Sequence, residues 1–326
     1  MITSPVDGIT LKTIVANGIT QRYAECGSGP TVLFCHGWPE SWYSWRHQML
    51  ALAAAGYRCI APDMRGYGGT DAPLDIEQYT LLDLVGDMVS LLRELEAKDA
   101  VVVGHDWGAP VAWHCALLRP DLFRAVVGMS VPWALRGKID LLSSLEKQGI
   151  TRFYMQYFQT PGVAEAELER DVRKSLSLVY FNSSGDQPDA EKSFAVLPAT
   201  GGFLDNKMAP AQPLTWLTES DLAWFTSEFT RTGFRGGLNW YRNLTRNWRL
   251  TSAWQSQPIR QPSMFIAGSR DSVLKFPASK AQIESFPKSL PGIRGTHILE
   301  GAGHWIQQER AAEVNRLLLE FLKGLE

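Results

Sequence analysis

One stretch of the sequence places a carboxylate where a reactive side chain is expected. A β-branched run at residues 101–103 leads into Gly-His-Asp-Trp-Gly at residues 104–108, and helical spacing resumes directly afterwards. The two glycines permit a strained turn between a strand and a helix, with Asp106 raised at its tip. Most turns of this kind carry serine at that position. The sequence therefore predicts a carboxylate nucleophile in place of a hydroxyl.

A carboxylate nucleophile suits a different reaction from a serine. Serine attacking a saturated carbon forms an ether, whereas a carboxylate forms an ester, and water can attack the ester carbonyl. Asp106 is ionised near neutral pH without a base, and the N-terminus of the following helix favours its negative charge. These properties favour substitution at sp3 carbon, such as epoxide opening or halide displacement. The alternative is that Asp106 caps the helix, because Asp is a preferred N-cap residue.

Two later loops each provide a titratable side chain after a predicted strand. Asp271 follows a strand at residues 264–267, and His304 follows a strand at residues 295–299. Parallel strands end at the same edge of a sheet, so both side chains can meet Asp106 there. We expect neutral His304 to take a proton from the water that attacks the ester, while Asp271 orients the imidazole. Taken alone, His304 is more typical of a cap or surface residue and Asp271 of a turn. Their order along the chain, with nucleophile, acid and base each after a strand, supports a single catalytic site.

Backbone and phenol donors complete the expected site. The N–H groups of Trp38 and Trp107 follow two strand ends and are expected to hold an oxyanion; removing one such donor typically costs about 3 kcal/mol. A tight turn at Trp38-Pro39 is compatible with that role. Opening an epoxide also creates an alkoxide, for which a tyrosine phenol is a suitable donor. The spacing leaves open whether Tyr154 or Tyr157 serves, and aromatic residues at helical spacing more often pack in a core.

Eight predicted strands, alternating with helices, are expected to position these side chains. This alternation favours one mostly parallel sheet with helices on both faces. Residues 132–254 instead show helical stretches, many aromatic side chains and little strand signal. We therefore expect a core of residues 1–131 and 255–326, with residues 132–254 inserted as a helical cap. The strands are predicted at residues 9–15, 19–26, 31–35, 57–61, 100–103, 123–129, 263–268 and 295–299.

Composition excludes several other functions. The 326 residues include 32 basic and 34 acidic side chains, with a net charge of −2 and no basic block, which argues against nucleic-acid and anionic-membrane partners. The chain begins without a leader-like segment and has no long apolar run, so we expect a cytoplasmic protein. We expect no metal or other cofactor. Four cysteines lie in apolar segments and are expected to be buried free thiols: Cys26, Cys35, Cys59 and Cys115.

Several motifs together resemble the α/β-hydrolase-fold epoxide hydrolases. The closest likeness is to the hydrolase domain of mammalian soluble epoxide hydrolase and to its actinobacterial relatives, and it covers essentially the whole chain. It implies Asp106 as nucleophile, His304 and Asp271 as the water-activating pair, the Trp38 and Trp107 amides as the oxyanion hole, and Tyr154 and Tyr241 as the two phenols. The motifs are Gly-His-Asp-Trp-Gly-Ala-Pro at 104–110, His-Gly-Trp-Pro-Glu-Ser at 36–41, Tyr-x-x-Tyr-Phe-Gln-x-Pro-Gly at 154–162, Asn-Trp-Tyr-Arg-Asn at 239–243, and Gly-His-Trp at 303–305.

The resemblance implies an α/β-hydrolase fold that converts small-molecule epoxides and water into vicinal diols, as a monomer or homodimer with a role in detoxification. The mammalian N-terminal phosphatase-like domain has no counterpart, because the first strand is predicted near residue 9, and we expect no phosphatase activity. Haloalkane dehalogenases share the Asp-Trp turn, but many place the triad acid after the next strand, and residues 129–135 contain no carboxylate. A non-catalytic small-molecule receptor on the same fold is the other alternative.

Overall fold

An eight-stranded sheet organises the chain, of which the structure, a computed structural model, describes residues 4–188, 195–276 and 278–325. The strands are β1 (Thr10–Ala16), β2 (Ile19–Cys26), β3 (Thr31–Cys35), β4 (Arg58–Pro62), β5 (Ala100–His105), β6 (Phe123–Met129), β7 (Ser263–Gly268) and β8 (Ile293–Leu299). Their spatial order is β1-β2-β4-β3-β5-β6-β7-β8. β2 pairs antiparallel with β1 and β4, and every other neighbouring pair is parallel. The predicted sheet of eight mostly parallel strands is confirmed.

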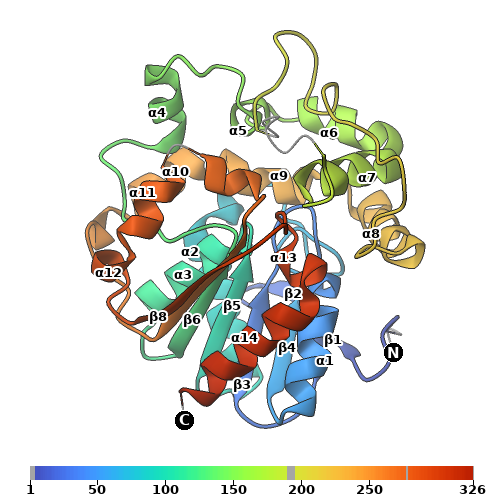
Figure 1. The fold of residues 1–326 in the computed structure, drawn as a ribbon. Helices are drawn as coiled ribbons and strands as arrows, with labels where there is room; N and C mark the ends of the chain where they lie inside the picture. The colour runs from blue at the N-terminus through green and yellow to red at the C-terminus, as the bar shows by residue number, and fades with distance from the viewer. Residues whose placement is uncertain (1–3, 189–194, 277, 326) are drawn as a thin grey trace.

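Helices cover both faces of this sheet (Figure 1). α1 (Arg46–Ala54) and α14 (Ala311–Lys323) pack together on one face, while α2 (Leu81–Glu94) and α3 (Gly108–Leu118) pack together on the other. α2 begins at a capping box in which Thr80 and Asp83 each bond the other's backbone N–H. The other described helices outside residues 132–254 are η1 (Trp42–Trp45), η2 (Ile76–Tyr79), η5 (Ser272–Lys275), α11 (Ser279–Glu284), α12 (Phe286–Ser289) and α13 (Ile306–Glu309).

A helical segment joins β6 to β7. Its described elements are α4 (Leu141–Lys147), α5 (Tyr154–Tyr157), α6 (Val163–Leu168), η3 (Glu169–Asp171), α7 (Val172–Ser183), α8 (Glu219–Thr232), α9 (Arg235–Arg242), α10 (Leu244–Leu250) and η4 (Ser252–Trp254). In its described part, the pairing of Phe153 with Val196 is an isolated β-bridge. These helices lie across one end of the sheet (Figure 1). We call residues 132–254 the cap segment and keep the division into 1–131, 132–254 and 255–326 as a proposal.

Two helical stretches are interrupted where the backbone departs from an α-helix. The stretch after Ser41 begins as η1, in which the Ser41 hydroxyl accepts from the Tyr43 N–H, and α1 follows. The stretch after Trp305 is divided, since Arg310 has a non-helical backbone (φ −131°, ψ 45°) between α13 and α14. The division matters because it leaves α13 as a separate turn directly after the His304 loop.

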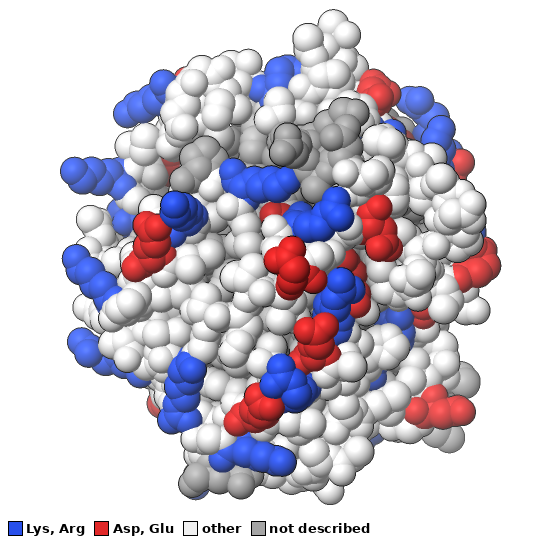
Figure 2. All heavy atoms as spheres, viewed as in Figure 1, with Lys and Arg blue, Asp and Glu red and all other residues white. Residues whose placement is uncertain are grey.

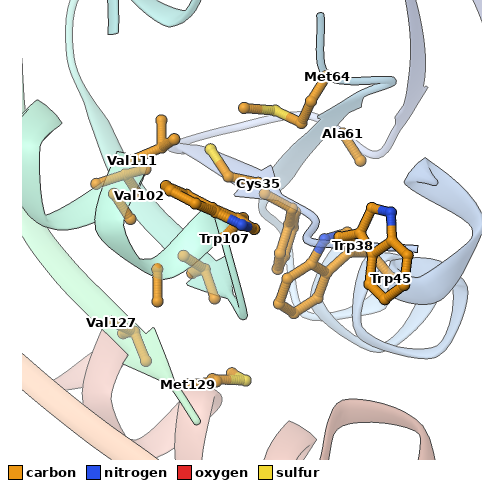
Figure 3. Close-up of a cluster of buried hydrophobic side chains, with 14 of the residues drawn as sticks. Cys35, Trp38, Trp45, Ala61, Met64, Val102, Trp107, Val111, Val127 and Met129 are labelled. Atoms are coloured by element: carbon orange, nitrogen blue, oxygen red, sulfur yellow. The ribbon is translucent and has the colours of Figure 1, made fainter. Parts of the chain in front are cut away.

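The central strands are fixed by packing on both faces. Every position of β3 and of β5 is buried, as expected for strands covered by helices on both sides. Val102 and Val127, from the neighbouring strands β5 and β6, lie in the same buried cluster as Trp38 and Trp107 (Figure 3). This packing holds the strand ends from which the candidate site emerges.

The remaining expectations concern cysteines, membranes and charge. All four cysteines are buried and free, as predicted. Among the described residues, no helix combines the length and the apolar character that a bilayer span requires. On the face shown in Figure 2, acidic and basic side chains are interspersed.

Candidate active site

Asp106 lies in a strained turn between β5 and α3. Its backbone is left-handed (φ 49°), a conformation that residues other than glycine rarely adopt. A Cβ on Gly104 would lie 2.0 Å from the Gly108 carbonyl oxygen, and one on Gly108 would lie 1.9 Å from the Cys35 carbonyl oxygen. Both positions therefore require glycine. The N-cap of α3 is Trp107, and Asp106 makes no side-chain capping bond there, so its carboxylate is available for chemistry.

The structure brings the three predicted triad residues together. The Nε2 atom of His304 lies 3.3 Å from Oδ2 of Asp106. Its Nδ1 atom lies 3.1 Å and 3.2 Å from the two carboxylate oxygens of Asp271. All three side chains are buried at the carboxyl ends of β5, β7 and β8. The imidazole therefore bridges a carboxylate that faces a cavity and a carboxylate that does not.

Burial and charge act in opposite directions on the three groups. Burial raises the pKa of each carboxyl, but the bonds to His304 and its charge outweigh burial and hold the pKa values of Asp106 and Asp271 below the ordinary range. Burial lowers the pKa of His304, but the charge of Asp271 and the hydrogen bonds to both carboxylates raise it well above its ordinary value. The imidazole and the two carboxylates therefore stabilise one another's charged forms.

One of the two expected oxyanion donors contacts Asp106. The Trp38 N–H donates to Oδ1 of Asp106 at 2.7 Å, and the Trp38–Pro39 peptide bond is cis. Among the hydrogen bonds of the described residues, none runs from the Trp107 N–H to this carboxylate, and its role stays a prediction. The two carboxylate oxygens therefore differ: Oδ1 is held by the backbone, while Oδ2 faces His304.

Two tyrosines of the cap segment line the same cavity as Asp106. Tyr154, at the start of α5, and Tyr241, in α9, have ring centroids 5.8 Å apart in a T-shaped contact. Burial raises the pKa of both phenols well above the ordinary value, and the negative charge of Asp106 adds to this. The phenols are therefore protonated donors. Tyr157, which the sequence left as an alternative to Tyr154, instead donates to Glu167 at 2.9 Å.

The cavity has a reactive end and a largely apolar wall. Asp106, His304 and the two tyrosines form the reactive end, with Trp38 beside them. No cluster of three or more His, Cys, Asp or Glu arranged to hold a metal ion occurs in the part of the chain that the structure describes. The other lining residues come from α7 and from the loops that follow β7 and β8: Val179, Ser183, Ser272, Val273, Phe276 and Trp305.

Sequence reasoning missed the groups that hold the backbone of His304. Its carbonyl oxygen accepts from Nε2 of His105 at 2.7 Å and from Oγ of Ser130 at 2.9 Å. The other ring nitrogen of His105 lies 2.8 Å from the buried carboxylate of Glu40. His105 lies in the motif at residues 104–110 and Glu40 in the motif at residues 36–41, so their positions in the sequence could have indicated a role in the site. Ser130 follows a strand and belongs to neither motif, so nothing in the sequence indicated its role.

Comparisons with known proteins agree with this geometry. A family model described as the α/β-hydrolase fold matches residues 30–178. Epoxide hydrolase A of Mycobacterium tuberculosis is 43% identical over 322 residues, which cover 97% of this chain and 98% of that protein. This chain belongs to the epoxide hydrolase family. Membership decides against the haloalkane dehalogenase and receptor alternatives, and it agrees with the predicted resemblance.

The epoxide hydrolase likeness extends to solved structures. An epoxide hydrolase from an endophytic Streptomyces superposes with a TM-score of 0.94 at 44% identity, covering 98% of this chain and 96% of that one. The bifunctional epoxide hydrolase 2 of Mus musculus is 38% identical over 312 residues, which cover 95% of this chain and 54% of the mouse protein. The similarity to the Streptomyces enzyme spans the sheet and the cap segment alike.

Proposed function

We propose that this epoxide hydrolase converts epoxides to vicinal diols through an ester on Asp106, which water activated by His304 and Asp271 then cleaves. One observation carries the proposal: Oδ1 of Asp106 is bound by the Trp38 N–H, while Oδ2 lies 3.3 Å from His304 at the reactive end of the cavity. A carboxylate held in this way has one oxygen prepared as the ester carbonyl and the other prepared as the nucleophile.

In the first step, Oδ2 of Asp106 attacks a ring carbon and the carbon–oxygen bond of the epoxide breaks. The electron pair remains on the epoxide oxygen, which takes a proton from the phenol of Tyr154 or Tyr241. Two facts support these roles: both tyrosines line the same cavity as Asp106, and their raised pKa values keep the phenols protonated. This step needs no base, because the carboxylate is already ionised.

In the second step, water attacks the ester carbonyl as His304 takes its proton. Esterification removes the negative charge of Asp106, so the imidazole loses one of the two anions that raise its pKa. His304 can then exist as the neutral base, with Asp271 holding its tautomer. The tetrahedral oxyanion forms at Oδ1, where the Trp38 N–H already donates. The ester bond breaks as the imidazolium of His304 protonates the leaving alkoxide, and the diol leaves with the former Oδ2 atom. The re-formed carboxyl of Asp106 loses its proton, which passes through solvent to the tyrosinate left by the first step.

This route makes a prediction about oxygen transfer. A single turnover of styrene oxide by excess enzyme in isotopically labelled water should leave the label on Asp106 and not in the diol. The reason is that the diol takes its new oxygen from the carboxylate, which water then replenishes. Mass spectrometry of the Asp106 peptide and of the diol measures both products. Label found directly in the diol would mean that water opens the ring, and the proposal would be wrong.

The two steps should respond differently to acid. Asp106 has a lowered pKa and stays ionised as the pH falls, whereas ester hydrolysis needs His304 as a neutral base, and in the ester Asp271 still raises the pKa of that imidazole. Between about pH 8 and about pH 5 we therefore expect ester formation to persist while ester hydrolysis slows. Rapid quenching and mass spectrometry should detect a growing esterified fraction as the pH falls. A fraction that shrinks in step with turnover would contradict this assignment.

We further propose that residues 132–254 act as a cap over the active site, supplying Tyr154 and Tyr241 against the nucleophile and base of the core. We also propose a cytoplasmic enzyme that removes reactive epoxides and acts as a monomer or homodimer, a proposal that rests on the family likeness.

A further inference from the structure

Glu309, the last residue of α13, accepts three backbone N–H groups at once. Its Oε2 atom accepts from Gly303 at 2.8 Å and from Gly185 at 2.9 Å, and its Oε1 atom accepts from Trp305 at 3.0 Å. Gly303 and Trp305 flank His304 in the sequence, while Gly185 follows α7 in the cap segment. One carboxylate therefore joins both sides of the His304 loop to a segment far away in the chain.

The charge of Glu309 is satisfied by these N–H groups and not by a cation. Within the described ranges no Lys or Arg forms an ion pair with Glu309, and the adjacent Arg310 instead lies 3.7 Å from Glu313. Burial raises the pKa of Glu309, and the three N–H bonds act against that rise. A carboxylate offers two acceptor oxygens, whereas a glutamine amide offers one and places a donor at the other position. The bonding pattern at this position thus requires a carboxylate.

The joined segments are also in direct backbone contact. The His304 N–H donates to the Ser183 carbonyl oxygen at 2.8 Å, and Ser183 itself lines the cavity. A Cβ on Gly185 would lie 2.2 Å from the Gly301 carbonyl oxygen, and one on Gly303 would lie 2.3 Å from the Gly185 nitrogen. Neither glycine can gain a side chain without moving one segment relative to the other. The position of His304 is therefore coupled to the end of α7.

We propose that Glu309 is a positioning residue for the hydrolytic step, which sets the imidazole of His304 against the Asp106 ester by tying its loop to Gly185. The inference rests on the proposed function. Ester formation does not require His304 to accept a proton, but ester hydrolysis does. A displacement of about 1 Å at a reacting group can lower a rate by roughly 100-fold. Loss of the Glu309 bonds should therefore slow hydrolysis selectively.

The test is Glu309→Gln, with Glu313→Gln as the matched control from the exposed start of α14. Rapid-quench mass spectrometry with styrene oxide measures ester formation and ester hydrolysis separately, and thermal unfolding measures stability. We expect Glu309→Gln to slow hydrolysis by about 10-fold to 100-fold and to accumulate ester, while ester formation changes less than about 2-fold. Glu313→Gln should match the wild type in both steps.

A second variant tests the same coupling from the cap side. Gly185→Ala leaves Glu309 intact but forces the two segments apart, and it should give the same selective loss of hydrolysis. Equal slowing of both steps in Glu309→Gln, or unchanged hydrolysis despite lost stability, would overturn the inference. If the wild-type enzyme itself forms no ester on Asp106, the proposed function fails instead, so the two failures are distinguishable.

Discussion

His304→Gln should form the Asp106 ester and then stop. Ring opening needs only the carboxylate and the phenols, whereas hydrolysis needs a base at 3.3 Å from Oδ2, where the imidazole now lies. General-base catalysis by such a group contributes about 10²-fold to 10⁴-fold, so we expect steady-state turnover to fall by roughly 10³-fold. Intact-protein mass spectrometry after treatment with styrene oxide should show one stoichiometric adduct, which peptide mapping should assign to Asp106.

His297→Gln is a suitable control for that variant, because His297 lies in β8, just before the same loop, but does not line the cavity. It should turn over normally and show no adduct. Recovery of only unmodified His304→Gln protein after epoxide treatment would count against the covalent route. Hydrolysis that continues at the wild-type rate in this variant would remove His304 from the mechanism.

Replacing both Tyr154 and Tyr241 with Phe should nearly abolish ring opening. The alkoxide that forms when the ring breaks is strongly basic, and the double variant leaves neither phenol to protonate it. Removing one donor to a developing oxyanion costs about 10²-fold to 10³-fold. We expect each single variant to lose about 10²-fold in the rate of ester formation, and the double variant to lose at least about 10³-fold.

Tyr157→Phe provides the matched control, because its hydroxyl donates to Glu167 and not into the cavity. Pre-steady-state ester formation should be close to wild type in this variant. The rate of ester hydrolysis should change little in any of the tyrosine variants. It can be measured in those variants in which the Asp106 ester accumulates. Largely unchanged ring opening in the double variant would refute the assignment of the two phenols.

Local sequence signals predicted the sheet and the positions of the triad residues. The turn at Asp106 was recognisable in the sequence from its two glycines. The structure shows why glycine is needed there, since close backbone contacts leave no space for a Cβ. Asp271 and His304 were recognisable because each follows a strand, and parallel strands end at one edge. Each of these predictions depends on a few residues. Each remains correct even when the predicted end of a strand or helix is wrong by one or two positions.

Residue spacing did not predict features that depend on packing between distant segments. Tyr154 and Tyr157 are three residues apart, so spacing left both open and only the family resemblance indicated Tyr154; the structure shows that Tyr157 donates to Glu167. The break at Arg310 interrupts a pattern that is continuous in sequence. In the sequence, Glu309 cannot be told from an exposed acidic residue. Its partners are backbone N–H groups, which leave no residue pattern, and one of them belongs to the cap segment.

The proposed reacting groups are divided between two parts of the chain. The proposed nucleophile, base and acid follow the ends of β5, β8 and β7, and the two proposed phenol donors come from helices of the cap segment. Substrate range can therefore diversify through exchange of cap helices without rebuilding the hydrolytic machinery. A chimaera must nevertheless preserve the backbone at residues 183–185, because the His304 loop bonds to it directly and through Glu309. A replacement cap segment is therefore restricted at residues 183–185, where its backbone must make the same hydrogen bonds.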